Sequence, residues 1–313
     1  MTVTVGVDIG GTKIAAGAVN DAGRILSVAK VTTPATDPAA IADAVATAVD
    51  RLRQHHDVEA VGIGAAGFVD ASRTAVLFAP NISWVEEPLA AHVAERVHLP
   101  VVVENDANAA AWGEFRFGAG RMFEDLMLVT VGTGIGGGLV HGGQLYRGAF
   151  GVAAEFGHLR MVPAGIRCGC GQYGCWEQYA SGRALVREAR DRIASGLPEA
   201  QPLADVAGSP EGLTGEMITE RARAGDPLCR ELLHDVGRWL GEGIASLSAV
   251  LDPAVVAVGG GVAAAGELLL GPARLAALRT LPAGTHRPHP QLRLATLGNE
   301  AGLIGAADLA RHR

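Results

Sequence analysis

The stretch Val5-Gly6-Val7-Asp8-Ile9-Gly10-Gly11-Thr12-Lys13 decides the fold of this 313-residue chain. A β-branched run leads into two glycines, a hydroxyl and a lysine, which predicts a strand, a tight turn and a second strand. A similar stretch, Val129-Thr130-Val131-Gly132-Thr133-Gly134-Ile135-Gly136-Gly137, occurs later. The repetition predicts a duplicated α/β unit with one glycine hairpin in each half, and two unrelated hairpins are the alternative.

The chemistry of both hairpins favours phosphate. Glycines let backbone N–H groups approach an anion closely, while threonine hydroxyls and a lysine add donors. Asp8 cannot bind phosphate directly, so we expect it to act through the hydration shell of Mg²⁺. A weaker signal is the cluster Gly259-Gly260-Gly261, which follows an apolar run and where a nucleotide could approach bare backbone. The expected nucleotide ligands are Asp8, Gly10, Gly11, Thr12, Lys13, Gly132, Thr133, Gly134 and Gly260.

Other nucleotide motifs are absent from the sequence. Gly132, Gly134 and Gly137 match the spacing of a dinucleotide fingerprint, but that motif must open a helix. Here the residues after Gly137 continue as a strand pattern. No G-x-x-x-x-G-K-[ST] stretch occurs either, which argues against a P-loop enzyme.

The rest of the chain alternates short β-branched runs with alanine-rich helical stretches, the pattern of an α/β protein. The expected strands are Val3–Val7, Ile14–Val19, Val61–Gly64, Val101–Val103, Leu126–Val131 and Ala254–Val258. The expected helices are Pro38–Gln54, Asn108–Phe117, Arg183–Ser195, Asp226–Leu251 and Ala301–Arg311, with a further helix starting near Gly266.

A polar cluster, Glu104-Asn105-Asp106-Ala107-Asn108, follows the strand Val101–Val103. Ligands of open α/β sheets gather at the carboxyl ends of strands, so this is a place for chemistry. If a phosphoryl group moves to an alcohol, a carboxylate must take the hydroxyl proton, and Asp106 is the candidate base. A helix cap is the alternative role, because Asn and Asp are favoured there.

Three of the four cysteines, Cys168, Cys170 and Cys175, lie within eight residues and follow His158. Three thiolates and one imidazole are the ligand set of a closed, structural Zn²⁺ site. A disulfide would leave one of the three cysteines unpaired, and free thiols or a redox sensor are further alternatives. We expect the metal to stiffen a glycine-rich loop.

Two carboxylates, Glu155 and Glu177, flank this cysteine loop. They could accept hydrogen bonds from neighbouring hydroxyls of a ligand, and a polar site that matches several hydroxyls discriminates strongly. Surface carboxylates without a role are the alternative.

Composition narrows the possible partners. A net charge of −7 without a dense Lys/Arg run argues against nucleic acid. No signal peptide and no apolar run of about 18 residues is found, so we expect a cytoplasmic protein without a membrane span.

Taken together, these motifs resemble the ROK family of sugar kinases and repressors, and within it the bacterial ATP-dependent glucokinases of the actinobacterial type. The resemblance extends from end to end. It implies an α/β, actin-like (ribonuclease H-like) ATPase fold with two α/β domains and a cleft between them. We expect a small domain of residues 1–117 plus 300–313 and a large domain of residues 118–299.

The resemblance also assigns roles. It implies that Asp106 is the catalytic base toward the sugar 6-hydroxyl and that Asn105, Asp106, Glu155, His158 and Glu177 hold the sugar. It implies Zn²⁺ ligands at His158, Cys168, Cys170 and Cys175, with His158 serving both metal and sugar. ATP with Mg²⁺, D-glucose and a homodimer or homotetramer are the implied partners.

The expected activity is transfer of phosphate from ATP to the 6-hydroxyl of D-glucose. Repressors of the family carry a DNA-binding segment ahead of the first glycine motif, and Asp8 leaves no room for one, so we expect an enzyme. Another hexose, such as N-acetylmannosamine, fructose or allose, is one alternative substrate, and a non-catalytic glucose sensor is another alternative.

Overall fold

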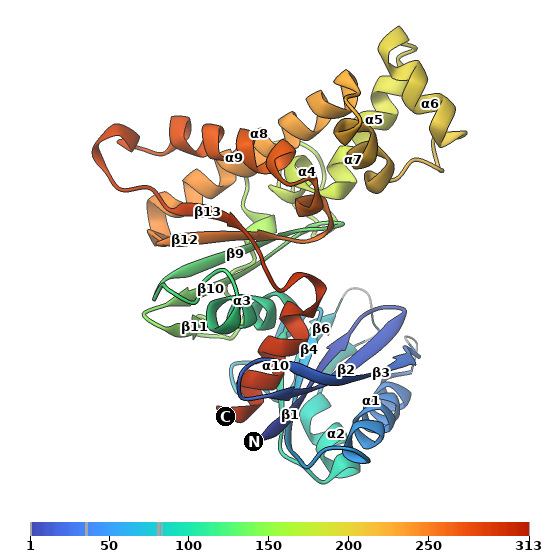
Figure 1. Cartoon of the computed structure of the whole chain (residues 1–313), viewed down its shortest axis with the longest axis vertical. Coiled ribbons are helices and arrows are strands. Elements are labelled where there is room, and N and C mark those ends of the chain that lie inside the picture. Colours follow the sequence, from blue (N-terminus) through green and yellow to red (C-terminus); the bar gives the residue numbers. More distant parts are fainter. Residues whose placement is uncertain (1, 35–36, 80–81, 83, 313) are drawn as a thin grey trace. The chain divides into compact units, whose positions relative to one another are not determined.

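Two five-stranded sheets form the framework of the computed structural model of this chain (Figure 1). The structure describes residues 2–34, 37–79, 82 and 84–312. The first sheet has the order β3-β2-β1-β4-β8 and the second β11-β10-β9-β12-β13. In each sheet the two strands that a glycine hairpin joins, β2-β1 and β10-β9, stand second and third in the order. This agrees with the predicted duplication.

The chain divides into two compact units. The first comprises Met1–Leu128, Gly138–Ala154 and Ala295–Arg313. Its main sheet contains β1 (Val3–Ile9), β2 (Lys13–Asn20), β3 (Ile25–Thr32), β4 (Val58–Ala65) and β8 (Val101–Asn105). A small sheet contains β5 (Phe68–Val69), β6 (Val76–Ala79) and β7 (Trp84–Glu87). The helices are α1 (Pro38–Arg53), α2 (Leu89–Val97), α3 (Asp106–Phe117) and α10 (Ala301–Arg311).

The alternation of valine and glycine in β1 gives the first sheet two different faces. Val5 and Val7 are fully buried in a core cluster with residues of α1 and α2. Gly6, between them, points to the other face, where an added Cβ would lie 1.8 Å from the carbonyl oxygen of Leu303 in α10. Gly62 of β4 meets Ala306 in the same way. The glycines therefore let α10 pack directly on the backbone of the sheet.

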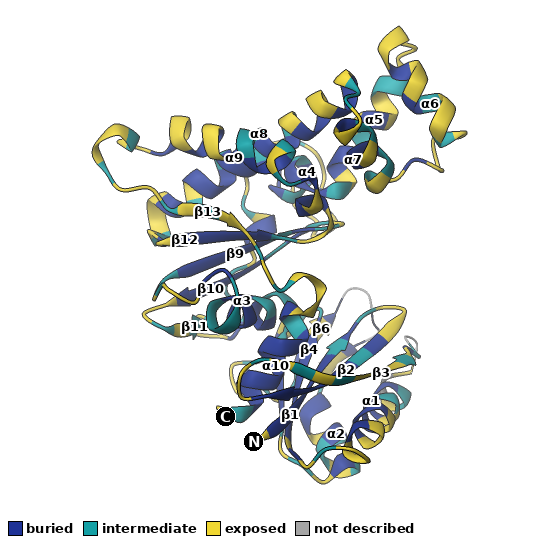
Figure 2. Ribbon diagram, viewed as in Figure 1, coloured by how far each residue is buried: buried dark blue, intermediate teal, exposed yellow. Residues whose placement is uncertain are grey.

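The second unit comprises Val129–Gly137 and Glu155–Leu294. The strands of the second sheet are β9 (Leu126–Val131), β10 (Ile135–His141), β11 (Gln144–Tyr146), β12 (Val255–Gly259) and β13 (Gln291–Leu294). The helices are α4 (Glu177–Ala180), α5 (Gly182–Ala194), α6 (Gln201–Ala207), α7 (Gly215–Arg223), α8 (Pro227–Leu251) and α9 (Glu267–Thr280). Figure 2 shows that β9 and β12 are largely buried.

The longest helix is α8, with 25 residues, which starts after the N-cap Asp226 and ends at Asp252 in a left-handed conformation. Its buried residues form one stripe that includes Leu232, Val236 and Leu240, as expected of an amphipathic helix on a core. Among the residues that the structure describes, no helix has the combination of length and hydropathy that a bilayer crossing requires.

Two helical glycines provide a matched test of the packing of α10. An added Cβ at Gly305 would lie 1.7 Å from the carbonyl oxygen of Ala109 in α3, whereas the nearest atom to one at Gly271 of α9 is 4.0 Å away. We predict that Gly305→Ala lowers the free energy of unfolding by about 1 to 3 kcal/mol because the helices must separate. Gly271→Ala should leave it unchanged or raise it by up to about 1 kcal/mol. Urea denaturation measures both, and equal effects would contradict this account.

Candidate active site and metal centre

Two carboxylates lie at one edge of the first sheet. Strands β1, β4 and β8 are parallel, so their carboxyl ends meet there. Asp8 pairs in register with Gly64, and Asp106 begins α3 directly after β8. A Cβ built on Gly64 would lie 3.7 Å from the Cα of Asp106, so little separates the strand ends. The candidate base and the candidate partner of Mg²⁺ therefore share one edge.

The helix cap at this edge is Asn105. Its side-chain Oδ1 accepts a hydrogen bond from the backbone N–H of Asn108 at 3.0 Å, and its Nδ2 donates to the carbonyl of Gly67 at 3.1 Å. Asp106 is in the first turn, where its Oδ1 accepts from the N–H of Ala107 at 2.9 Å. Capping, the alternative role considered for these residues, thus belongs to Asn105.

Both carboxyl groups at this edge hold protons more tightly than an exposed aspartate. Burial raises the pKa of Asp106 above its ordinary value. Burial, with the nearby charge of Asp106, raises the pKa of Asp8 to about 6, against the opposing effect of Lys13. Desolvated carboxylates with raised pKa values form a site that a hard cation would stabilise, so the donor set fits Mg²⁺.

The first glycine hairpin joins β1 to β2. The N–H of Gly10 donates to the carbonyl of Lys13 at 3.1 Å, and Thr33 Oγ1 donates to the carbonyl of Gly10 at 2.7 Å, so both sides of the turn are fixed. Around Gly11 an added Cβ would meet no atom within 4 Å. Thr12 and Lys13 are exposed. The turn therefore offers accessible backbone and a cation, as a phosphate ligand requires.

The second glycine hairpin lines a cavity of about 600 Å³ in the second unit. This volume is in the range of cofactor sites. The cavity lies among the hairpin, the starts of α5 and α7, and the short helix η3 (Gly261–Ala265). Its lining comprises Gly132, Thr133, Gly182, Arg183, Val186, Gly215, Glu216, Thr219, Glu220, Arg223, Gly261, Val262 and Ala264.

Several contacts hold the hairpin against α5. The N–H of Gly182 donates to the carbonyl of Gly132 at 2.8 Å. Ser181 caps α5 by accepting from the N–H of Ala184 at 3.2 Å. Arg183 adds a positive charge at the N-terminus of α5, a combination that favours anions, and Arg223 in the last turn of α7 adds a second positive charge to the lining. Of this lining the sequence pattern had identified Gly132, Thr133 and, as part of a glycine cluster, Gly261.

Gly260 supports the same cavity without lining it. Its φ is 85°, and an added Cβ would lie 2.5 Å from the carbonyl oxygen of Val131. Only glycine fits a left-handed residue this close to another backbone. Gly260 thus lets η3 start beside the hairpin strand.

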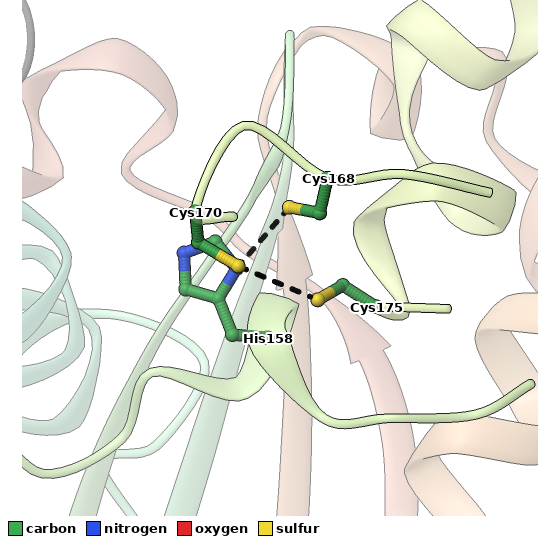
Figure 3. A group of neighbouring side chains, drawn as sticks. All are labelled: His158, Cys168, Cys170 and Cys175. Carbon is green, nitrogen blue, oxygen red and sulfur yellow. Dashed lines mark hydrogen bonds between the residues drawn. The ribbon is translucent and has the colours of Figure 1, made fainter. Parts of the chain in front are cut away.

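The four expected metal ligands form one cluster in the second unit (Figure 3). Their ligand atoms all lie within 4.8 Å of one another. Cys170 Sγ is 3.7 Å from Cys175 Sγ, and Cys168 Sγ is 3.7 Å from Nδ1 of His158. Ligands on a tetrahedral Zn²⁺ at normal bond lengths are about 3.8 Å apart. Sulfurs in a disulfide would be about 2 Å apart. The residues therefore fit a tetrahedral metal ion.

The clustered cysteines can all be thiolates at the same time only if a cation balances their negative charges. Burial, with the hydrogen bond that the thiol donates to Glu177 and its contacts with the neighbouring thiols, raises the pKa of Cys168 to about 12. Since metal ligands must be thiolates, a bound ion would supply the missing positive charge. All four cysteines are free thiols in this structure.

The loop that carries the cysteines has little regular secondary structure. Gly174 has φ 76°, and an added Cβ would lie 1.6 Å from the carbonyl of Val162. The next anchor is Trp176, fully buried, whose Nε1 donates to the carbonyl of Trp239 in α8 at 2.8 Å. Ahead of these anchors, the backbone from Cys168 to Gln172 is held by turn hydrogen bonds, so a metal would add much of its order.

The expected sugar ligands fall into two groups. Asn105 and Asp106 belong to the first unit, whereas Glu155, His158 and Glu177 belong to the second. Glu155 precedes η1 (Phe156–His158), and both Glu155 and His158 are exposed. Glu177 Oε1 accepts from Cys168 Sγ at 3.1 Å, and an added Cβ on Gly134 would lie 2.4 Å from Glu177 Oε2. Glu177 therefore contacts both the metal cluster and the glycine hairpin.

Comparison with known proteins identifies relatives along the whole chain. The model of the ROK family matches residues 4–313. Glucokinase of Streptomyces coelicolor is 55% identical over 312 residues, which are 99% of this chain and 98% of that protein. N-acetylmannosamine kinase of Escherichia coli is 35% identical over 98% of each chain.

A solved structure is similarly close. The ROK family glucokinase of Streptomyces griseus, in complex with glucose and AMPPNP, is 56% identical and has a TM-score of 0.90. The match covers 99% of this chain and 100% of that chain. The chain therefore belongs to the ROK family and has its actin-like α/β fold.

The raised pKa of Asp8 predicts a stabilising substitution. A carboxyl with a folded-state pKa near 6 and an unfolded one near 3.8 stabilises the protonated folded state, and this contribution is lost as the pH rises through 6. Asp8→Asn should therefore raise the free energy of unfolding by about 1 to 3 kcal/mol at pH 8, and by less at pH 5. Chemical denaturation without divalent cations measures the difference. An equal gain at both pH values would contradict the assignment.

Proposed function

We propose, from membership of the ROK family, that this chain is an ATP-dependent glucokinase that converts D-glucose to glucose 6-phosphate. The observation that carries the proposal is 55% identity to a glucokinase along nearly the full length of both chains. The placement of Asp106 at the carboxyl edge of the first sheet supports the same chemistry.

Asp106 acts as the general base. The 6-hydroxyl oxygen forms a bond to the γ-phosphorus while the bond from that phosphorus to the leaving ADP oxygen breaks, and the hydroxyl proton passes to the Asp106 carboxylate. Burial raises the pKa of this carboxyl, which makes it a stronger base than an exposed aspartate. The cap formed by Asn105 holds the turn from which the base projects.

The glycine hairpins bind the phosphates of ATP. Thr12 and Lys13 in the first unit, and Thr133 with the 600 Å³ cavity in the second, supply hydroxyls, backbone donors and positive charge. Mg²⁺ bound with ATP neutralises charge on the transferring phosphoryl group. Asp8 would hold this ion through its water shell.

The remaining polar residues recognise sugar hydroxyls. Asn105, Glu155, His158 and Glu177 are donors and acceptors that can pair with several hydroxyls at once, and each unpaired group would cost affinity for a different sugar. N-acetylmannosamine is the main competitor, because a kinase for that sugar is 35% identical to the chain. Rates with both sugars separate these substrates.

Zn²⁺ is the ion that we assign to His158, Cys168, Cys170 and Cys175. With four protein ligands the site has no open position, so the metal is structural. Nδ1 of His158 faces the cluster, which leaves Nε2 for a sugar hydroxyl. The homodimer or homotetramer and the cytoplasmic location expected from the sequence remain part of the proposal.

Replacement of the base tests the catalytic assignment. Asp106→Asn should lower kcat with glucose and ATP by at least about 100-fold, because the proton has no acceptor. The metal content should not change. Asp21→Asn, at an exposed turn between β2 and β3, is the control and should retain full activity. A coupled ADP assay gives both rates, and near-normal turnover of Asp106→Asn would refute the assignment.

A cysteine substitution tests the metal assignment. Cys175→Ser should reduce zinc from about one ion per chain to a small fraction and abolish activity through loss of loop order. Cys229→Ser removes a buried thiol of α8 outside the cluster. This control variant should keep both its zinc and its activity. Metal analysis and glucose titration measure these effects. Normal glucose affinity in metal-free Cys175→Ser would show that the metal does not support the sugar site.

A further inference from the structure

Glu104 is a buried carboxylate directly before the candidate catalytic turn. It is the last residue but one of β8, lies two residues ahead of Asp106 and is only 1% exposed. Its Oε1 accepts hydrogen bonds from the backbone N–H of Asn105 at 3.0 Å and from Nδ2 of Asn108 at 3.1 Å. One oxygen of Glu104 thus binds both the cap residue and the first turn of α3.

The other oxygen of Glu104 lies between two arginines. Oε2 is 2.8 Å from Nε of Arg147 and 3.2 Å from Nε of Arg73. Oε2 of Glu104 and Nε of Arg147 are close, but their geometry does not meet the angles of a hydrogen bond. The contact between them is therefore an ion pair. A buried charge is costly unless it is paired, so removal of either partner disturbs the other.

The arginines connect Glu104 to two other segments of the first unit. Nη1 and Nη2 of Arg147 donate to the carbonyls of Ala71 and Asp70, both at 2.8 Å. The carbonyl of Arg73 accepts from the N–H of Val103 in β8 at 3.0 Å. Three segments, residues 70–75, 103–108 and the start of 147–154, therefore meet at a single carboxylate.

The loop that begins at Arg147 is packed closely on the turn at residues 70–75. Gly151 has φ 85°, and an added Cβ would lie 2.6 Å from the carbonyl oxygen of Val69. Along the chain this loop leads to Glu155, one of the expected sugar ligands. Backbone contacts between this loop and the turn at residues 70–75 therefore fix the position of the ion pair.

We propose that Glu104 is a positioning residue for phosphoryl transfer, with Arg147 as its principal partner. The proposal rests on the proposed glucokinase function. Glu104 fixes the backbone from which Asp106 projects, and Arg147 ties that backbone to the loop leading to Glu155. A displacement of a catalytic group by about 1 Å can lower the rate by a factor on the order of 100. The contacts of Glu104 and Arg147 should therefore affect mainly kcat.

A second buried carboxylate provides a matched control. Asp308 of α10 is also 1% exposed, accepts from Trp112 Nε1 at 2.9 Å, and lies near Arg311 at 2.9 Å and Arg116 at 3.5 Å. Like Glu104 it accepts from a side-chain N–H and is paired with two arginines, but its partners do not include Asn105 or Asn108. Its loss should cost stability without a specific effect on catalysis.

The experiment compares Glu104→Gln with Asp308→Asn in the full chain. Gln keeps the shape but loses the negative charge, so the two arginines repel and the turn shifts. We expect Glu104→Gln to lower kcat about 10- to 100-fold at saturating glucose and ATP, with KM for ATP within about twofold of wild type. Asp308→Asn should keep kcat within about twofold. Thermal melts at the assay pH confirm that both variants are folded.

Arg147→Lys gives an independent test if Glu104→Gln fails to fold. Lysine keeps the positive charge but cannot also donate to both carbonyls, so kcat should fall with KM for ATP unchanged. Wild-type kcat in the folded variants, or an equal kcat loss in Asp308→Asn, would overturn the positioning role. A wild-type chain that does not phosphorylate glucose would instead refute the proposed function.

Discussion

Parallel pairing of β1, β4 and β8 is the constraint on which the candidate active site depends. It brings the carboxyl ends of three strands to one edge, and with them Asp8, Glu104 and Asp106. One face of this sheet is covered by α10. Gly6 and Gly62 have no side chains, so the backbone of α10 can pack directly on β1 and β4. The electrostatics follow, because burial at this edge raises the pKa values of Asp8 and Asp106.

The second sheet uses the same strand order for a different task, which the second unit carries out. Its hairpin and the start of α5 offer backbone donors and arginines to an anion, in a cavity made entirely by that unit. The metal cluster lies beside this hairpin, because Glu177 contacts both Cys168 and Gly134. A metal that orders the cysteine loop would therefore also order a carboxylate next to this cavity. This shared residue would give a metal in the loop a role beyond the loop itself.

Local patterns in the sequence were sufficient for much of the fold. Leu126–Val131 and Ala301–Arg311 have the bounds that the pattern predicted, and both hairpins were found because glycine turns are local signals. The four side chains of the Cys/His cluster were found for the same reason, since three of the four lie within eight residues. The ionic partner of Glu104 was not found, because Arg147 is distant in sequence and only the fold brings them together. Arg183 and Arg223 of the cavity were missed likewise, and so were short strands such as Trp84–Glu87.

The central claim is that the chain transfers phosphate from ATP to the 6-hydroxyl of glucose. Its most direct test is identification of the product after incubation of the purified chain with ATP, Mg²⁺ and glucose, by mass spectrometry and ³¹P NMR. The account predicts glucose 6-phosphate and ADP in equal amounts, with no ADP formed when glucose is omitted. Glucose binding without phosphorylated sugar would contradict it and would indicate a sugar sensor.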